Sequence, residues 1–176
     1  MQSLKNLIKT SLLVCLAVVT TFAAIISTSC NRDKCRSTLC ANGGVCTNGA
    51  CTCSIGYQGA NCTVVSRLVF IGNWQAQGKS SASESAQYPV SIVAGNSAIN
   101  NIMIENFQNY FTSPISAYVV NDSLYIPSQQ VQGKSIFGSG QIKVAKYPAA
   151  TTIVINTTAT DLTTNITTTE TDVLTE

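Results

Sequence analysis

Six cysteines form the densest group of reactive side chains in this sequence. They lie between Cys35 and Cys62, separated by 4, 5, 4, 1 and 8 residues. A stretch of about 28 residues cannot bury a core of its own, so it needs covalent cross-links to hold a shape. Thiols that are committed to disulfides are not available as nucleophiles or as zinc ligands. Six thiols allow fifteen pairings in principle.

The spacing resembles an epidermal-growth-factor-like (EGF-like) module over residues 35–62. The turns Asn42-Gly43-Gly44 and Gly56-Tyr57-Gln58-Gly59 add to the resemblance, since both place glycine where a positive φ is needed. The resemblance implies the disulfides Cys35–Cys46, Cys40–Cys51 and Cys53–Cys62. It names a module and not an activity.

The first 29 residues have the order of a secretory signal peptide. Lys5 and Lys9 precede an uncharged apolar run over residues 11–26, and the small residues Ser27-Thr28-Ser29 follow it. A run of about 16 residues is short for a membrane-spanning helix, which needs about 20. A signal-anchor helix is the alternative. Export agrees with the cysteines, because disulfides persist in oxidising compartments.

Cys30 is the one cysteine after the signal peptide that does not belong to the EGF-like cysteine pattern. Ser27-Thr28-Ser29-Cys30 resembles the lipobox of a bacterial lipoprotein, in which the cysteine is acylated, with palmitate for example, and becomes the first residue. Ser27 departs from the usual aliphatic residue, as in the looser boxes of Bacteroidota. The resemblance implies lipidation at Cys30 and a membrane anchor, with residues 30–34 as linker. The alternative is a spare thiol that pairs between chains.

Charge and composition narrow the functional classes. Without Lys5 and Lys9, the mature chain has eight basic and eight acidic residues. We expect no nucleic-acid partner, which would call for a clustered basic face. Because the chain has no histidine, Ser-His and Cys-His catalytic arrangements are excluded. The acids of the β domain show no repeated spacing that would indicate a working pair, although a glycosidase-type carboxylate pair stays open because a sequence does not show spatial pairing. We expect no enzyme and no cofactor.

We also expect no metal site, and no calcium in particular. Many EGF-like modules bind calcium through acids before the first cysteine. Here Asp33 is the one acid at that place, next to Lys34. Calcium needs several oxygen ligands.

Residues 66–176 are predicted to form an all-β domain. They are rich in Ile, Val, Thr and Tyr, which favour strands. Alternating runs bounded by Gly, Pro, Asn and Ser predict about eight strands. These runs are 68–74, 88–93, 101–107, 116–120, 124–127, 135–146, 151–158 and a last one within 165–174. Short connections favour an antiparallel meander, closed as a barrel or folded as a sandwich.

Local signals refine this prediction. Asn121-Asp122 favours a tight hairpin, and Gly138 and Gly140 indicate a bend or bulge in a long strand. The serine-rich segment 78–87 is predicted to be a mobile loop. The threonine-rich last 26 residues favour a closing polar hairpin over a disordered tail, because Ile, Val and Leu still recur there.

The β domain also resembles a C-terminal domain common in Bacteroidota lipoproteins. Gly72-Asn73-Trp74 resembles the Gly-x-Trp of lipocalins and related calycin barrels, which implies a structural Trp74 packed across the barrel floor. The domain is shorter than a typical lipocalin, which argues against a roomy cavity. Three further segments carry the resemblance, Tyr88-Pro89-Val90-Ser91-Ile92, Leu124-Tyr125-Ile126-Pro127-Ser128-Gln129 and Gly138-Ser139-Gly140.

These observations predict a non-enzymatic, lipid-anchored protein of the cell envelope. We expect an outer-membrane lipoprotein, with the periplasmic or cell-surface side left open. Its EGF-like module would be a spacer, and its β domain would serve binding, adhesion or scaffolding toward a protein or glycan. The alternative is a small lipocalin-like carrier of an apolar ligand. An exposed aromatic patch would favour the first hypothesis.

The ligand-binding residues stay unknown at this level. The aromatic side chains that could line a binding surface are Tyr110, Phe111, Tyr118, Tyr125 and Phe137. Core packing is the default expectation for each of them.

Overall fold

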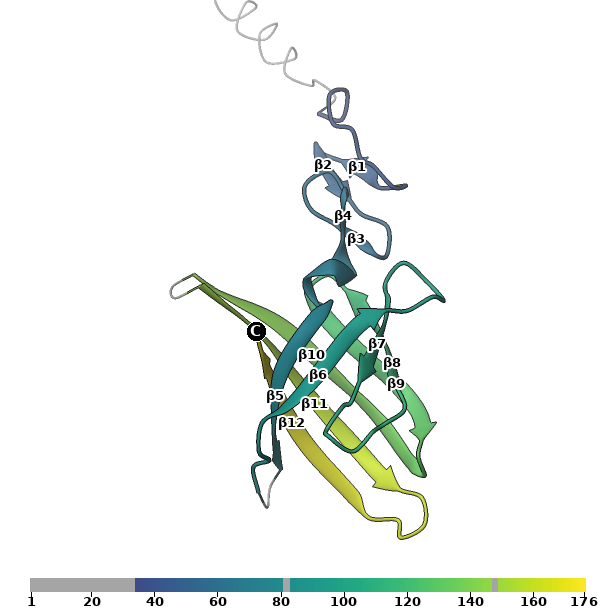
Figure 1. The fold of residues 1–176 in the computed structure, drawn as a ribbon. Helices are drawn as coiled ribbons and strands as arrows, with labels where there is room; N and C mark the ends of the chain where they lie inside the picture. The colour runs from purple at the N-terminus through teal and green to yellow at the C-terminus, as the bar shows by residue number, and fades with distance from the viewer. Residues whose placement is uncertain (1–33, 81–82, 147–148) are drawn as a thin grey trace, which may run out of the picture.

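The computed structural model describes residues 34–80, 83–146 and 149–176. A small disulfide module and a β-barrel lie end to end, so the protein is elongated (Figure 1). The predicted signal peptide and Cys30 lie outside the described residues. In the part of the chain that is described, no helix is long and apolar enough to cross a membrane.

The N-terminal module is held by three disulfides, Cys35–Cys46, Cys40–Cys51 and Cys53–Cys62. This is the pairing that the EGF-like resemblance implies. Two short hairpins complete the module, one formed by β1 (Val45–Thr47) and β2 (Ala50–Thr52), the other by β3 (Tyr57–Gln58) and β4 (Val64–Val65). None of these strands is buried, which agrees with a module that depends on cross-links more than on a core.

The barrel is a closed, antiparallel, eight-stranded meander, so the all-β prediction is confirmed and the barrel is chosen over the sandwich. A short 3-10 helix, η1 (Ser66–Val69), leads into it. The strands are β5 (Gly72–Ser80), β6 (Tyr88–Ala94), β7 (Asn101–Glu105), β8 (Ile115–Val120), β9 (Ser123–Val131), β10 (Lys134–Lys146), β11 (Ala149–Asp161) and β12 (Thr167–Thr175). Each strand pairs with the next, and β12 pairs with β5 to close the ring.

Alternation of side chains builds the core of the barrel. In β5, Trp74 and Ala76 are buried while Asn73, Gln75 and Gln77 face solvent. The same period places a continuous apolar cluster inside the ring. The interior is therefore packed with side chains, as in other small barrels.

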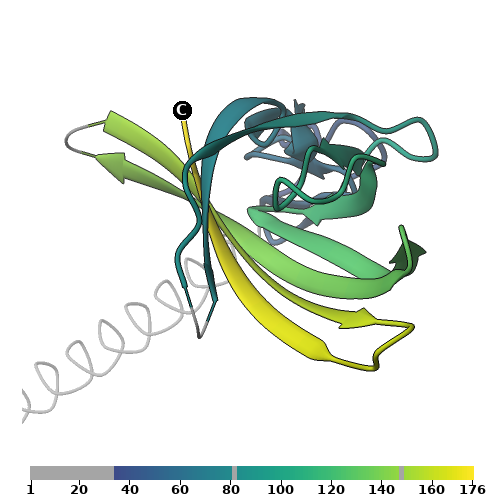
Figure 2. The same ribbon diagram turned by 60° about the horizontal axis from the view of Figure 1, so that its bottom comes forward.

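Both ends of the barrel are covered. At the end nearest the module, Phe70 follows η1 and is fully buried, and its carbonyl accepts a hydrogen bond of 3.0 Å from Trp74 Nε1. At the other end lies the β7–β8 loop (Figure 2). Its Phe107 and Phe111 are buried. Trp74 thus lies in the core with its one polar atom satisfied.

Three of the differences from the predicted strand boundaries have a clear cause in the fold. The first strand begins at Gly72 and not at residue 68, because residues 66–69 form η1. β9 continues past Pro127 to Val131, since Lys134–Ile136 of β10 pairs with it there. The serine-rich loop is shorter than predicted, because Gly78–Ser80 pairs with β12 and Lys79 bridges to Glu84.

Candidate functional site

An exposed aromatic group lies on the outer surface of the barrel. Tyr118 on β8 and Tyr125 on β9 are cross-strand partners, and each is 39% exposed. Their rings stack with centroids 5.3 Å apart and planes inclined by 19°. Phe137 on β10 is 50% exposed. We call these three residues the aromatic face.

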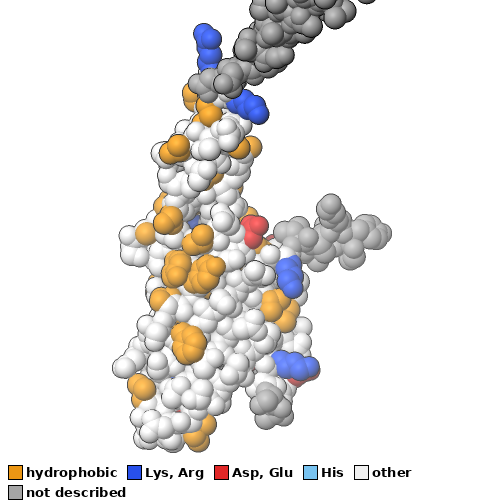
Figure 3. Space-filling model, turned by 180° about the vertical axis from the view of Figure 1, so that it is seen from behind, with side chains coloured by type: hydrophobic (Ala, Val, Ile, Leu, Met, Phe, Trp, Pro, Cys, Tyr) orange, Lys and Arg blue, Asp and Glu red, His pale blue; other side chains and the backbone are white. Residues whose placement is uncertain are grey.

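The surface on this side of the barrel carries few charged side chains. Figure 3 views the barrel from behind and shows hydrophobic side chains gathered below the module, among mainly uncharged polar groups. Tyr118 and Tyr125 cover one another on one side each, so only the other face of each ring can receive a ligand. Large exposed aromatic groups on a packed domain are typical of binding surfaces.

A groove of about 240 Å³ opens beside Tyr125, on the side away from Tyr118. Small residues form its floor, because Ser123, Ser139 and Gly140 carry little or no side chain. The remaining lining residues are Tyr125, Gln141, Lys143, Val154 and Asn156. We call this the polar groove.

Strand register explains why these residues meet. Ser139 of β10 pairs with Tyr125 on one side and with Asn156 on the other. Side chains of the same parity on one strand share a face, so Gln141 and Lys143 follow Ser139 along the same outer surface of β10. The groove is therefore built on paired strands, which hold side chains more rigidly than loops do.

Hydrogen bonding orients one of the lining amides. The Oδ1 of Asn156 accepts a hydrogen bond of 2.7 Å from Thr171 Oγ1. The NH₂ group of Asn156 then remains to donate toward the groove. With the hydroxyls of Ser123 and Ser139 and the amide of Gln141, the groove offers donors and acceptors beside one aromatic ring.

A second hollow, of about 420 Å³, lies over β5–β7 and is lined in part by Glu105 and Glu176. Trp74 contributes to its lining, but only 3% of that residue is exposed. This hollow therefore offers no aromatic ring to a ligand. It differs from the polar groove both in charge and in the lack of an exposed ring.

A separate polar cluster lies inside the barrel. The hydroxyl of Tyr88 donates a hydrogen bond of 2.6 Å to Asp172, a fully buried residue. Gln108 from the β7–β8 loop donates to Thr157 Oγ1 at 2.9 Å and to Asp172 Oδ2 at 3.4 Å. Glu170 lies two residues before Asp172, and oxygens of both carboxyl groups lie against Gly78.

Burial dominates the electrostatics of this cluster. It raises the pKa of Asp172, although the hydrogen bonds from Tyr88 and Gln108 act in the opposite direction. Burial, together with the charge of Asp172, raises the pKa of Glu170. Burial and the bond to Asp172 raise the pKa of Tyr88 above its ordinary range. The cluster is enclosed by the core and by the β7–β8 loop, so it is part of the interior.

The predicted aromatic candidates separate in the structure. Phe111 is in the core, while Tyr118, Tyr125 and Phe137 are exposed and lie on neighbouring strands. Tyr110 is also exposed, but Lys134 Nζ lies 4.2 Å from the centre of its ring. Within the described residues, no group of three or more acidic, cysteine or histidine side chains is placed to hold a metal ion.

Sequence reasoning missed the polar half of the groove. Ser139, Gln141 and Lys143 have one parity within the predicted run 135–146, and that signal could have placed them on one face. The run could not show that Asn156 lies alongside, because that depends on the pairing of β10 with β11.

Residues 37–65 match the family described as the Teneurin-like EGF domain. This segment is an EGF-like domain. The match covers the disulfide module and does not reach the barrel. The EGF-like domain with its three disulfides indicates an exported protein.

Other comparisons leave the barrel without a functional relative. No curated protein matches the chain. Among solved structures, the chain is similar to a protein of unknown function from Bacteroides ovatus, with 13% identity and a TM-score of 0.37. The match covers 59% of this chain and 40% of that one. A likeness this distant assigns neither fold nor function.

Proposed function

We propose that this protein is a non-enzymatic glycan-binding lipoprotein of the bacterial cell envelope. Its barrel would bind a glycan in the polar groove, and its EGF-like domain would be the spacer between barrel and membrane. The observation that carries the proposal is the polar groove with the free face of Tyr125 as its wall.

The chemistry of the groove favours a glycan over an apolar ligand or a flat protein surface. A sugar ring presents C–H groups on one face, which pack on an aromatic ring, and hydroxyls around its edge. Tyr125 supplies the ring, while Asn156, Gln141 and Ser139 supply amides and a hydroxyl within the same groove. Ligand sites commonly combine apolar contact with a few placed polar groups in this way.

The carrier alternative finds less support in the barrel interior. Among the residues whose burial is described, twenty buried side chains form one cluster there, with Phe70 at one end and Phe107 at the other. An apolar cargo would need to displace this core. We therefore place the ligand outside the barrel.

The membrane anchor is the second part of the proposal. We propose that Cys30 is the acylated first residue, on the strength of Ser27-Thr28-Ser29-Cys30 and of the even use of the other six exported cysteines in disulfides. Only residues 31–34 separate Cys30 from the domain, a reach of about 13 Å at full extension. The barrel lies at the far end of the EGF-like domain, so it would project away from the bilayer (Figure 1).

Intact-mass spectrometry of the membrane-extracted protein tests the anchor. The expected mass is that of residues 30–176 with acyl chains on Cys30 and six oxidised thiols. A mass that includes residues 1–29 would contradict the anchor and leave the glycan site untouched. The outer-membrane location is tested separately, by fractionation of the envelope.

Glycan binding is tested with an array of bacterial and host glycans, followed by titration of the hits. We expect Tyr125→Ala to weaken binding by about tenfold or more, because the ring contact is lost; tenfold is about 1.4 kcal/mol. Tyr110→Ala is the matched control, since Tyr110 is similarly exposed but lies outside the groove. Absence of any hit on the array, or equal binding by Tyr125→Ala, would contradict the proposal.

A further inference from the structure

We infer that the glycan recognised by the polar groove is anionic, with a carboxylate or sulfate group placed at Lys143. This inference rests on the proposed function and narrows it to a ligand class. Its basis is the charge of the groove lining, which contains one lysine and no aspartate or glutamate.

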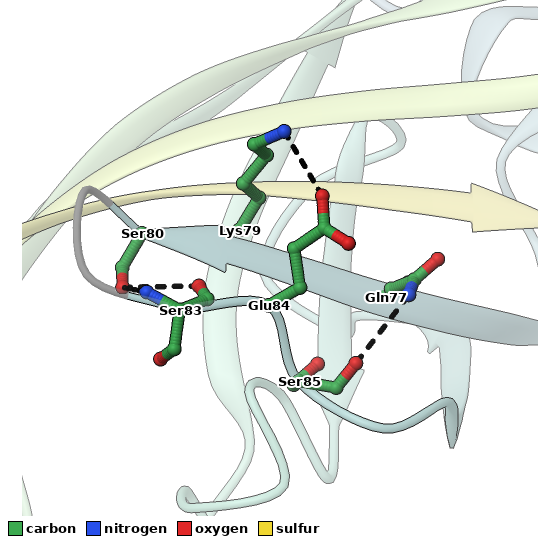
Figure 4. Close-up of polar contacts among 6 residues, drawn as sticks. All are labelled: Gln77, Lys79, Ser80, Ser83, Glu84 and Ser85. Carbon is green, nitrogen blue, oxygen red and sulfur yellow. Dashed lines mark hydrogen bonds and ion pairs between the residues drawn. The ribbon is translucent and has the colours of Figure 1, made fainter.

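Lys143 differs from Lys79 and Lys134 of the barrel in having no compensating contact. Lys79 forms an ion pair of 2.9 Å with Glu84 (Figure 4). Lys134 lies over the ring of Tyr110. Among the described residues, the Lys79–Glu84 pair is the one ion pair, so the ammonium group of Lys143 is left to a ligand or to water.

Asp122, an acid next to the same part of β10, makes no ion pair with Lys143. Asp122 occupies the β8–β9 turn, and its main-chain oxygen accepts a hydrogen bond of 3.1 Å from the Ile142 amide. Its side chain is exposed, does not line the groove and makes no ion pair with Lys143. A charged group in the groove would therefore meet a positive potential at the Lys143 end.

The spacing along β10 sets the size of the ligand. Tyr125 faces Ser139, and Lys143 lies four residues further along the same strand. Four residues of antiparallel strand span about 14 Å. A single sugar ring that packs on Tyr125 does not extend over that length. The backbone spacing therefore favours an oligosaccharide with one ring at Tyr125 and an acidic group on a following residue.

The contacts at Tyr125 and Lys143 also predict which oligosaccharides bind more tightly. Neutral oligosaccharides of the same backbone keep the ring contact and lose the ion pair. An exposed ion pair contributes little, so the preference for the acidic form should be modest and should shrink as salt is added. We expect about fivefold, which is about 1 kcal/mol.

Matched oligosaccharides test this inference on the mature full-length protein in detergent. One pair is oligogalacturonate and its methyl ester, and the other is a sulfated oligosaccharide and its desulfated form. We expect wild type to prefer the acidic member of at least one pair, and the two pairs distinguish carboxylate from sulfate. Lys143→Met should abolish the preference, and Lys79→Met should keep it.

The outcomes separate the two proposals. Equal binding of acidic and neutral members, with loss of both in Tyr125→Ala, would overturn the anionic ligand and keep the glycan site. If Lys143→Met still prefers the acidic oligosaccharide, the inference is also overturned, because another residue would then bind the acidic group. No binding of any saccharide, here and on the array, would overturn both.

Discussion

Asp172 shows how a single side chain can oppose the stability of the barrel at neutral pH. It is fully buried, and burial raises its pKa more than the bonds from Tyr88 and Gln108 lower it. Glu170 is less buried, and its pKa is raised in the same direction. Both acids therefore bind a proton more tightly in the folded barrel than in the unfolded chain.

This difference fixes the sign of a pH effect. A raised folded-state pKa gives stability that is fully present below the unfolded pKa, near 4, and is lost as pH rises through the folded value. The free energy of unfolding should thus contain a contribution that falls as the pH rises above about 4. The fluorescence of Trp74, the single tryptophan and a core residue, reports unfolding of the barrel.

In Asp172→Asn, the free energy of unfolding should decrease less steeply with pH, because a major titrating group is removed. Part of the decrease should remain, because Glu170 still titrates. Denaturant unfolding at several pH values measures the slope. Asp161→Asn is the control. Asp161 is the last residue of β11, and hydrogen bonds from the Thr164 and Thr163 amides lower its pKa. Its contribution is lost as pH falls, the opposite sign. An unchanged slope in Asp172→Asn would show that another group is responsible.

At the scale of elements, β10 is shaped by glycine. The register between β9 and β10 shifts between Ile136 and Gly138, but the extra residue lies on β9, which goes from Gln129 to Ile126 there, and not on β10 as predicted. Gly138 faces inward, and a Cβ there would collide with the main-chain oxygen of Asn156 and lie 2.8 Å from Thr157 Cγ2. Glycine therefore lets β10 approach β11 closely at this point.

Gly138→Val should destabilise the barrel by about 1–3 kcal/mol, the usual cost of overpacking a core. Ser135→Val is the matched control, because it makes a β-branched residue at a position of opposite parity on the same strand. That change should stay within about 0.5 kcal/mol. Unfolding followed by Trp74 fluorescence measures both variants. A tolerated Gly138→Val would mean that β11 can move away from β10.

The elements that sequence could predict are those with a local signature. Alternation located all eight barrel strands, and Asn121-Asp122 located the β8–β9 turn, where Asn121 has a φ of 53°. Features that depend on a distant partner were missed. The extension of β9 beyond Pro127 requires β10, and the shortening of the serine-rich loop requires β12. The polar groove likewise needs β9, β10 and β11 together, so no single segment could reveal it.

At the scale of the whole molecule, η1 joins the EGF-like domain to the barrel through Arg67. Its Nη1 donates to the main-chain oxygens of Gly95 and Asn101, both at 3.0 Å, and of Ala98 at 3.3 Å. These bonds are charge-assisted, and they fasten η1 to the β6–β7 loop. Ile99 of the same loop lies against Gly56 of the EGF-like domain. The EGF-like domain is thus attached to the barrel by side-chain contacts in addition to the chain itself.

Arg67→Ala should loosen this joint without unfolding either part, because the disulfides and the barrel core do not depend on it. Amide ¹⁵N relaxation compares how the two parts tumble. In wild type we expect one shared correlation time, and in Arg67→Ala a shorter time for the EGF-like domain than for the barrel. Arg36→Ala, an exposed arginine at the far end of the domain, should leave the shared time unchanged. If wild type already shows two correlation times, the Arg67 contacts do not hold the parts together, and the EGF-like domain is a flexible tether. If Arg67→Ala keeps one time, the Gly56–Ile99 contact and the chain through η1 suffice for a rigid display of the groove.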